Sequence, residues 1–260
     1  MKDKHFVVTG GANGIGAETC GLLRDAGARL TILDIRKPDH PVDRYLPLDL
    51  NDLGSIDRAV AAIETPVDAL LNIAGLPPRP GLASTVLRVN FFGLRRLTLG
   101  LLPRMVEGGA IVNVASRAGA QWREHIAQVK AMMVLADDAD LDDFCREQAI
   151  DDTRAYNLSK EAVLVWTMAQ TESLISRGLR MNTVSPGAVT TGILDDFKTA
   201  FGERTVAMLK RVGRPAHPAE VGQLIVFLTS PASAWLKGVD VPIDGGIGAL
   251  GASDALGLGA

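Results

Sequence analysis

The chain has 260 residues, of which 47% are hydrophobic and 22% are charged, and its formal net charge is -3. This much apolar material can bury a large core and excludes an intrinsically disordered chain. Because lysine and arginine are scattered and form no basic run, we expect neither a nucleic-acid partner nor a membrane-surface partner.

The two cysteines, Cys20 and Cys145, and the four histidines form no metal-binding pattern. We therefore expect no metal site and two free thiols. The N-terminal residues contain no signal-peptide core, and no apolar run reaches the length needed to span a bilayer. A cytoplasmic location is expected, in agreement with free thiols in a reducing compartment.

The first strand is expected at Phe6–Thr9, and a glycine-rich turn at 10–16 follows directly. The apolar spacing after it predicts a helix from Ala17 to Ala26, which Gly27 ends. Glycines at this point allow a tight turn that approaches a pyrophosphate, while the helix N-terminus offers it free N–H groups. The strand, turn and helix together indicate a dinucleotide site.

The second strand, Arg29–Asp34, ends in an acid about 20 residues after the glycine turn, where an acid binds the ribose 2′-hydroxyl of adenosine. A carboxylate there also repels a 2′-phosphate, so Asp34 favours NAD over NADP. Arg36, two residues further on, could bind the 2′-phosphate of NADP, so this alternative stays open. Asp34 could also be an ordinary turn residue at the end of a strand.

Further strands are expected at residues 45–48, 67–71 and 110–114, with helices at about 52–64 and 84–102. The fourth strand ends in Asn72-Ile73-Ala74-Gly75, and Ser116 lies just past the fifth. Ligands gather at the carboxyl ends of strands in open parallel sheets, so both places are candidate parts of a site.

Residues 117–154 combine Trp122, an apolar helical piece and an acidic run at 137–143. The acidic run is interpreted as a solvated turn between two helices. It has no EF-hand glycine or terminal glutamate, so calcium binding is not expected.

Tyr156 and Lys160 are four residues apart in a helix expected to open at Tyr156 and to run to about Arg177, so they share one helix face. A cation beside a phenol lowers the pKa of the phenol, which makes Tyr156 a candidate general acid/base. Taken alone, the spacing is also compatible with two unrelated surface residues.

Strands at 179–184 and 239–244 and a helix at 219–228 complete the pattern, with a helical segment at 190–209 and an unassigned tail from Gly245. Strands alternate with helices throughout, and no linker or repeat interrupts them. We expect an α/β fold in which residues 1–260 form a single Rossmann domain, a doubly wound parallel sheet with helices on both faces.

In their order and position, these motifs resemble the short-chain dehydrogenase/reductase family, and the match covers essentially the whole chain. The residues that carry the resemblance are Thr9-Gly10-x-x-x-Gly14-x-Gly16, Asp34, Asp49-Leu50, Asn72-x-Ala74-Gly75, Asn90, Ser116, Tyr156-x-x-x-Lys160, Pro186-Gly187 and Thr191.

The resemblance implies catalytic roles for four residues. Tyr156 would be the general acid/base on the substrate oxygen. Lys160 would lower the pKa of Tyr156 and bind the nicotinamide ribose, and Ser116 would polarise the carbonyl or hydroxyl. Asn90 would hold a water molecule that links Lys160 to solvent.

The resemblance also implies NAD as the cofactor. The residues that would contact NAD are Gly10, Asn13, Gly14, Ile15 and Gly16 at the pyrophosphate, Asp34 at the adenosine ribose, Asp49 and Leu50 at the adenine, Asn72, Ala74 and Gly75 along the cofactor, Tyr156 and Lys160 near the nicotinamide ribose, and Pro186, Gly187, Val189 and Thr191 at the nicotinamide amide.

Three departures from the family pattern stand out. Ile73 replaces a usual asparagine, and Ala115 replaces a usual serine. Tyr156 follows Ser116 by 40 residues, which is far more than in most of the family. Much of 117–154 is therefore interpreted as a helical insertion, which is most similar to the branch of 3α-hydroxysteroid dehydrogenase/carbonyl reductase and coniferyl alcohol dehydrogenase.

The expected substrate pocket is mostly apolar and suits a bulky, weakly polar alcohol or carbonyl compound. Arg117 could bind a substrate carboxylate or could be a surface residue. The leading hypothesis is the NAD-dependent interconversion of a hydrophobic secondary alcohol and its ketone. Alternatives are oxidation of a coniferyl-type aromatic primary alcohol and a non-catalytic NAD-binding regulator. The expected wall residues are Leu76, Pro77, Ala118, Trp122, Val189, Ile193, Leu194 and Phe197.

Members of this family usually form dimers or tetramers, often through the helix that carries the tyrosine. Because 117–154 lies next to that helix in sequence, we expect it to block or replace that interface. A homodimer is therefore expected, with a tetramer as the alternative.

Overall fold

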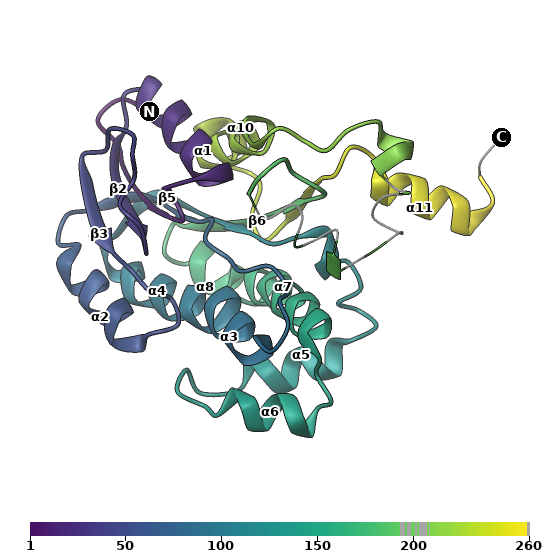
Figure 1. The fold of residues 1–260 in the computed structure, drawn as a ribbon. Coiled ribbons are helices and arrows are strands. Elements are labelled where there is room, and N and C mark those ends of the chain that lie inside the picture. Colours follow the sequence, from purple (N-terminus) through teal and green to yellow (C-terminus); the bar gives the residue numbers. More distant parts are fainter. Residues whose placement is uncertain (193–195, 197–198, 201, 203–206, 208, 259–260) are drawn as a thin grey trace.

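The computed structural model describes residues 1–192, 196, 199–200, 202, 207 and 209–258. Its centre is a sheet of seven parallel strands in the order β3-β2-β1-β4-β5-β6-β7 (Figure 1). This order confirms the predicted doubly wound α/β fold, because the chain runs outwards from the centre of the sheet in both directions. The strands are β1 (His5–Thr9), β2 (Arg29–Asp34), β3 (Arg44–Pro47), β4 (Val67–Asn72), β5 (Met105–Val114), β6 (Arg180–Pro186) and β7 (Asp240–Ile243).

The central strands are buried on both faces because helices cover both faces of the sheet. Every residue of β1 and β6 is buried. Within the sheet, Val8 pairs with Ile32 of β2 on one side and with Leu71 of β4 on the other. Nearly continuous apolar runs of this kind are typical of parallel strands.

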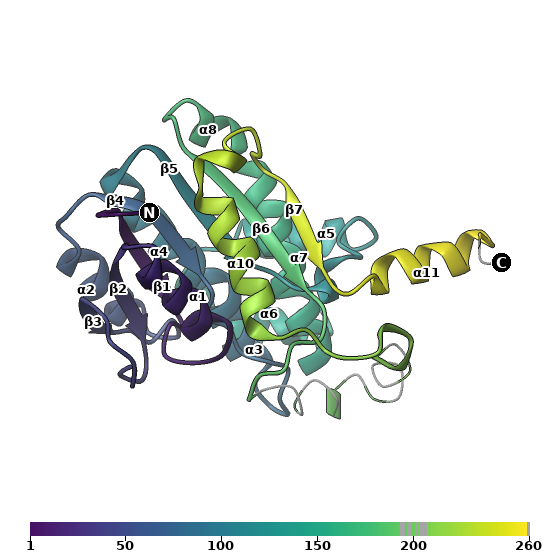
Figure 2. The same ribbon diagram turned by 90° about the horizontal axis from the view of Figure 1, so that it is seen from above.

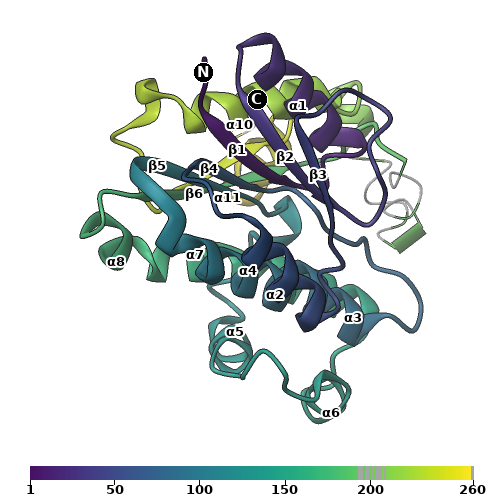
Figure 3. The ribbon, with the colours of Figure 1, turned by 90° about the vertical axis from the view of Figure 1, so that its left-hand side faces the viewer.

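Helices α1 and α10 lie on one face of the sheet, and α2, α4 and α7 lie on the other (Figure 3). Each helical layer buries its own apolar cluster, with Leu23 and Ile225 in one and Ile56 and Leu97 in the other. The helices are α1 (Gly14–Asp25), α2 (Leu53–Ala62), α3 (Ala83–Leu87), α4 (Leu94–Leu101), α5 (Ile126–Met133), α6 (Leu141–Glu147), α7 (Asp152–Ala169), α8 (Thr171–Ile175), α10 (Pro218–Thr229) and α11 (Ile247–Leu256). No helix among the described residues is long and apolar enough to cross a membrane.

The helix predicted at 84–102 is not one regular α-helix. A π-helical turn, Arg88–Gly93, joins α3 to α4. At its end Gly93 packs directly on the main chain of Leu50, where an added Cβ would lie 2.4 Å from the Leu50 carbonyl oxygen. π-Helical turns are rare and often occur at functional sites, and this one carries Asn90.

Helix α7 begins four residues before Tyr156, which was expected to open it. Asp151 caps the helix, because its carboxylate accepts a hydrogen bond from the main-chain N–H of Arg154 at 2.7 Å. Tyr156 therefore lies in the second turn of α7, with one helical turn before it and another after it.

Residues 117–154 form two additional helices outside the main helical layer (Figure 3). α5 packs against α7, and α6 packs against α3. Between them, the acidic run was expected to be solvated, and for Asp137 this is wrong. Its carboxylate binds Arg95 at 2.6 Å and Arg96 at 3.5 Å, and its side chain is only 21% exposed.

The main chain of this turn is bound by arginines as well. Arg88 and Arg95, on the π-helical turn and on α4, donate hydrogen bonds to four successive odd-numbered carbonyl groups of the turn. These belong to Met133, Leu135, Asp137 and Ala139. We call Arg88, Arg95 and Arg96 the arginine clamp, since they fix the turn between α5 and α6 to the body of the protein.

The unassigned C-terminal tail contains α11, which projects from the body (Figure 2). None of its residues is buried, and Leu256 is 71% exposed. Most of the segment predicted to be helical at 190–209 lies outside the described residues.

Candidate active site

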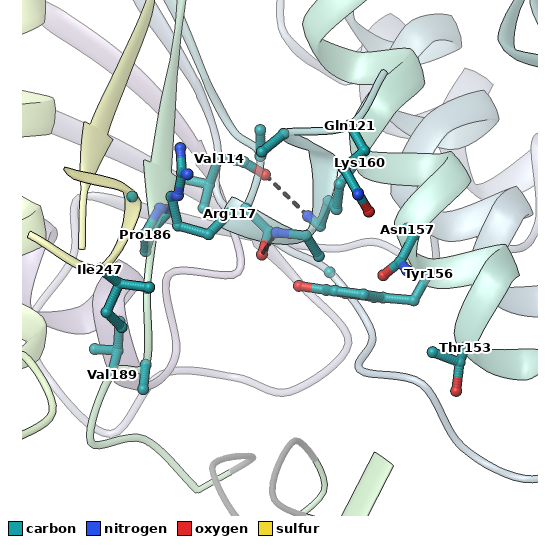
Figure 4. Close-up of a pocket in the computed structure, with 18 of the residues that line it drawn as sticks. Val114, Arg117, Gln121, Thr153, Tyr156, Asn157, Lys160, Pro186, Val189 and Ile247 are labelled. Carbon is teal, nitrogen blue, oxygen red and sulfur yellow. Dashed lines mark hydrogen bonds between the residues drawn. The ribbon is translucent and has the colours of Figure 1, made fainter. Parts of the chain in front are cut away.

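A cavity of about 850 Å³ lies at the carboxyl ends of β4, β5 and β6 (Figure 4). The residues that directly follow these strands, Ile73, Ala115 and Gly187, line it. Helix α7 contributes Tyr156 and Lys160 to the same cavity. The sheet topology thus brings together segments more than a hundred residues apart in sequence, as expected for an open parallel sheet.

Ser116 and Tyr156 meet at this cavity. Ser116 follows β5, and its hydroxyl accepts a hydrogen bond from the main-chain N–H of Ala118 at 3.1 Å. Burial raises the pKa of Tyr156 to about 12, while its hydrogen bond with Ser116 acts in the opposite direction. The pair therefore forms a hydroxyl-to-phenol contact at the point where β5 and α7 approach each other.

Lys160 lies one helical turn after Tyr156 and is only 5% exposed. Its ammonium donates a hydrogen bond to the carbonyl oxygen of Val114 at 2.9 Å (Figure 4) and lies 5.8 Å from the centre of the Tyr156 ring. Burial lowers the pKa of Lys160 to about 8. The expectation that Lys160 lowers the pKa of Tyr156 is not met in this structure, because burial of the phenol outweighs the other influences on it.

Asn90 lies close to the lysine but binds the main chain. Its side-chain oxygen accepts a hydrogen bond from the N–H of Leu76 at 2.7 Å, and its side-chain nitrogen donates to the Leu76 carbonyl oxygen at 3.0 Å. Gly75 separates Asn90 from Lys160: an added Cβ at Gly75 would lie 3.2 Å from the Asn90 oxygen and 3.4 Å from the Lys160 nitrogen. The expected proton relay through Asn90 stays a prediction.

The glycine-rich turn fits a dinucleotide. Gly10 has φ +69°, and an added Cβ would lie 2.8 Å from the main chain of Ala74, while one at Gly16 would lie 2.0 Å from the Gly10 carbonyl oxygen. Asn13 caps α1 without a side-chain hydrogen bond, and the first turn contains no acid. The N–H groups of this turn are therefore available to a phosphate.

Asp34 is held beside this turn by two main-chain hydrogen bonds. One carboxylate oxygen accepts the N–H of Ala12 and the other accepts the N–H of Arg36, each at 3.0 Å. A carboxylate fixed at the end of β2 can accept a ribose hydroxyl. The Arg36 side chain itself is exposed.

Not every predicted cofactor residue presents its side chain to the cavity. The Asn72 amide is buried and donates to Thr98 at 2.9 Å and to Asn113 at 2.8 Å. Leu50 belongs to the apolar core, and Asp49 uses its carboxylate to accept the N–H of Asn51 at 2.8 Å. These three residues stabilise the local structure, and their contacts with a cofactor stay predictions.

The segment after β6 lies against the glycine-rich turn. Pro186, Gly187, Val189 and Thr191 all line the cavity. An added Cβ at Gly14 would lie 3.3 Å from the Thr191 side chain. The residues predicted for the nicotinamide end thus share one continuous surface with Ile15 and Gly75, whereas Asp34, Asp49 and Leu50, predicted for the adenosine end, do not line this cavity.

The cavity walls differ from the expectation. Leu76, Ala118 and Val189 line the cavity, whereas Pro77 is buried elsewhere and Trp122 packs against the core. Ile193, Leu194 and Phe197 lie outside the described residues.

Arg117 is half-buried and has an ion-pair partner. It lines the cavity, and its guanidinium Nε lies 3.0 Å from the carboxylate of Asp244, which is only 10% exposed. Asp244 also accepts the N–H groups of Gly246 and Gly248 at 2.9 Å each. Because Arg117 already has this partner, it is poorly placed to bind a substrate carboxylate.

Sequence reasoning missed two groups of lining residues. Gln121, Glu124, Thr153 and Asn157 form a polar wall, and Ile247, Gly248, Gly251 and Ala252 come from the start of α11. Thr153 and Asn157 could have been found, since helical spacing puts Thr153 on the same side as Tyr156 and Asn157 one turn further on. The tail gave no comparable signal.

Comparison with known proteins agrees with this geometry. Residues 4–128 match the family described as short chain dehydrogenase, and residues 141–248 match the one described as enoyl-(acyl carrier protein) reductase. Coniferyl-alcohol dehydrogenase of Pseudomonas sp. (strain HR199 / DSM 7063) is 36% identical over 95% of this chain and 97% of its own length. The 3-alpha-hydroxysteroid dehydrogenase/carbonyl reductase of Comamonas testosteroni is 32% identical over 94% of this chain and 96% of its own length.

A solved structure is similar over nearly the whole fold. The 3-alpha-hydroxysteroid dehydrogenase from Pseudomonas sp. B-0831, determined in complex with NADH, superimposes with a TM-score of 0.82 at 31% identity and covers 95% of this chain and 98% of that one. The chain belongs to the short-chain dehydrogenase/reductase family. It is an oxidoreductase of that family, and its fold is one that binds a nicotinamide cofactor.

Proposed function

We propose that the protein is an NAD(H)-dependent oxidoreductase that interconverts a hydrophobic secondary alcohol and its ketone. The observation that carries this proposal is the convergence of Ser116, Tyr156 and Lys160 on one cavity. The substrate class is supported by Leu76, Val189 and the start of α11, which give the cavity an extensive apolar lining, and by the 3α-hydroxysteroid dehydrogenases among its relatives.

The residues divide the work between placement and proton transfer. Tyr156 accepts the hydroxyl proton during oxidation and returns a proton to the carbonyl oxygen during reduction. Ser116 holds the reacting oxygen next to the tyrosine, and Lys160 adds a positive charge to this buried site. The bound nicotinamide supplies the hydride acceptor or donor.

We infer NAD rather than NADP from Asp34. Its carboxylate is fixed toward the glycine-rich turn, where it can accept a ribose hydroxyl and repels a phosphate at the same position. The relative whose structure contains NADH supports this preference.

A second candidate substrate is an aromatic primary alcohol. It is favoured by the 36% identity with a coniferyl-alcohol dehydrogenase over nearly the whole chain. The same catalytic residues serve both candidate substrates, so the fit of each substrate to the walls of the cavity decides between them.

Replacement of Tyr156 with phenylalanine tests the catalytic assignment. We expect the variant to lose at least about a hundredfold in kcat/KM on secondary and aromatic primary alcohols, because general acid/base catalysis contributes about 10²- to 10⁴-fold. NADH binding, followed by fluorescence titration, should change by less than about threefold. Unchanged turnover would remove Tyr156 as the acid/base. A wild-type protein that binds NADH but oxidises no alcohol of the panel would instead favour a non-catalytic regulator.

A further inference from the structure

The polar wall of the cavity has no role in the chemistry described above. It consists of Gln121 and Glu124, from the segment after β5, and of Thr153 and Asn157 on α7. Thr153 and Asn157 lie one helical turn apart beside Tyr156 (Figure 4). A pocket for a wholly apolar substrate is not expected to have four hydrogen-bonding side chains along one side.

Two of these side chains lack adequate partners. The buried side-chain oxygen of Asn157 has no hydrogen-bond partner among the described residues. Glu124 has no ion pair within the described part of the chain and only a long contact, 3.5 Å, with the amide nitrogen of Gln121. Because buried polar atoms are normally paired, the unpaired oxygen of Asn157 indicates that a ligand completes this wall. The carboxylate of Glu124 is exposed, and its charge on the same wall has no cation partner among the described residues.

The other charges near the cavity are already balanced or distant from this wall. Arg117 is paired with Asp244, and Arg211 with Asp254. Arg123 stacks on the ring of Trp122 at 4.2 Å and does not line the cavity. Lys160 is held at the catalytic end by Val114. Glu124 is thus the unbalanced charge of the polar wall, as far as the described residues show.

The wall is also held firmly in place. Gly119 packs against the main chain of Lys160, where an added Cβ would lie 2.9 Å from the carbonyl carbon. His125, next to Glu124, contacts the carboxylate of Glu161 at 2.8 Å. Glu161 is fully buried and also binds the guanidinium of Arg154 at 2.6 Å and 2.8 Å. The segment that carries Gln121 and Glu124 is therefore fixed to α7 at both of its ends.

We infer that this wall selects the far end of the substrate: it accepts a neutral hydrogen-bond donor such as a hydroxyl group and rejects a carboxylate. Glu124 and Asn157 provide the acceptors, and the negative charge of Glu124 repels an anion. The inference rests on the proposed function and narrows it, because the preferred substrate is then an alcohol or ketone with a second, distal hydroxyl group.

Two series of probe alcohols test the inference. One consists of cinnamyl alcohols with a 4-hydroxy, 4-methoxy or 4-carboxy group. The other consists of 3α-hydroxyandrostanes with a 17β-hydroxy, 17β-methoxy or 17β-carboxy group. In the series that is turned over, we expect the hydroxyl compound to exceed the methyl ether by about tenfold in kcat/KM, since a hydrogen bond to a charged acceptor is lost in the ether. The carboxylate should be at least about tenfold poorer than the ether.

Variants assign these effects to the wall. Glu124→Gln should raise kcat/KM for the carboxylate by about tenfold, and Asn157→Ala should reduce the preference for hydroxyl over methyl ether by about threefold to tenfold. Because Glu124 is exposed, wild-type rejection of the carboxylate should weaken in 0.5 M NaCl, whereas that of Glu124→Gln should not change. Glu147→Gln, at an exposed carboxylate on α6 away from the cavity, is the matched control. It should leave both kcat/KM ratios, hydroxyl compound to ether and carboxylate to ether, unchanged.

A binding measurement separates this inference from the proposed function. Dissociation constants of the same compounds for the NADH-saturated protein, from cofactor fluorescence, give the ranking even if no compound is turned over. If Glu124→Gln leaves the carboxylate as poor a ligand as before, with unchanged salt dependence, the inference is overturned. Failure of turnover with the expected binding ranking would contradict only the proposed function.

Discussion

The charge of Lys160 depends on whether the chain is folded. In the unfolded chain its pKa is that of an ordinary lysine, and burial lowers the pKa of Lys160 to about 8 in the folded protein. Between these two values the unfolded state binds more protons than the folded state, so stability contributed at this position rises with pH. Below pH 8 the folded protein must keep a buried ammonium, which disfavours folding.

Substitution of Lys160 with methionine should expose this effect. From pH 7 to pH 10 we expect the free energy of unfolding of the cofactor-free wild type to gain about 2 to 3 kcal/mol relative to Lys160→Met. Urea unfolding at pH 7, 8.5 and 10 measures it. Lys130→Met, at an exposed position on α5, controls for the loss of a lysine. A difference that stays constant over this range would contradict the lowered pKa.

The role of Asp34 in cofactor choice can be tested by a single substitution. Asp34→Ala removes a fixed acceptor for the ribose and the repulsion of a 2′-phosphate. We expect NADH to bind about tenfold more weakly and the preference for NADH over NADPH to narrow, as measured by fluorescence titration of both cofactors. The exposed Asp39 in the same loop provides the control variant Asp39→Ala. A wild-type protein that prefers NADPH would overturn the role given to Asp34.

The sequence predicted individual residues best where chemistry depends on local spacing. Ser116, Tyr156 and Lys160 do line one cavity, because strand ends and helical turns fix their positions. Gln121 and Glu124 were missed because their place depends on how residues 117–125 cross over α7. The direction of the pKa of Tyr156 was also missed, since burial of a side chain is a property of the folded protein.

At the scale of elements, the arginine clamp explains how the α5–α6 unit is attached. Arg95 is largely buried, with 11% of its side chain exposed, and stacks over Phe91 and Phe92 at 5.3 Å and 4.9 Å. Asp137 is the carboxylate that balances this arginine. If that carboxylate were removed, the largely buried charge of Arg95 would lose its ion-pair partner.

Asp137→Asn should therefore destabilise the protein by about 1 to 3 kcal/mol, which lowers the melting temperature by several degrees. Differential scanning calorimetry measures the change. Asp138→Asn alters the exposed neighbour and should cost less than about 0.5 kcal/mol. Equal melting temperatures for the two variants would show that the acidic turn is solvated after all.

All seven predicted strands exist, because buried parallel strands are short apolar runs that the sequence displays directly. Helices were harder. The π-helical turn at Arg88–Gly93 leaves the apolar spacing of 84–102 nearly unchanged, so only the hydrogen-bond pattern reveals it. The ion pairs of Asp137 were hidden because their partners lie about forty residues earlier in the chain.

For the whole molecule, we propose a homodimer. α5 and α6 lie outside α7 and α3, and most residues of α7 are buried on several sides, including Glu161 and Trp166. A partner subunit therefore cannot pack closely on α7 without displacing α5. Light scattering at two protein concentrations should give the mass of two chains. A stable tetramer would contradict the proposal.

The two sides of the cavity have very different support. The polar wall is attached to α7 through Gly119 and Glu161, whereas the opposite side includes the first turns of α11, a helix with no buried residue. We therefore expect this pocket to discriminate between ligands on the α7 side and not on the α11 side. Analogues that differ in bulk toward Ile247 and Ala252 should be accepted alike, so a collection of inhibitors would show a steep structure–activity relationship on the α7 side and a flat one on the α11 side.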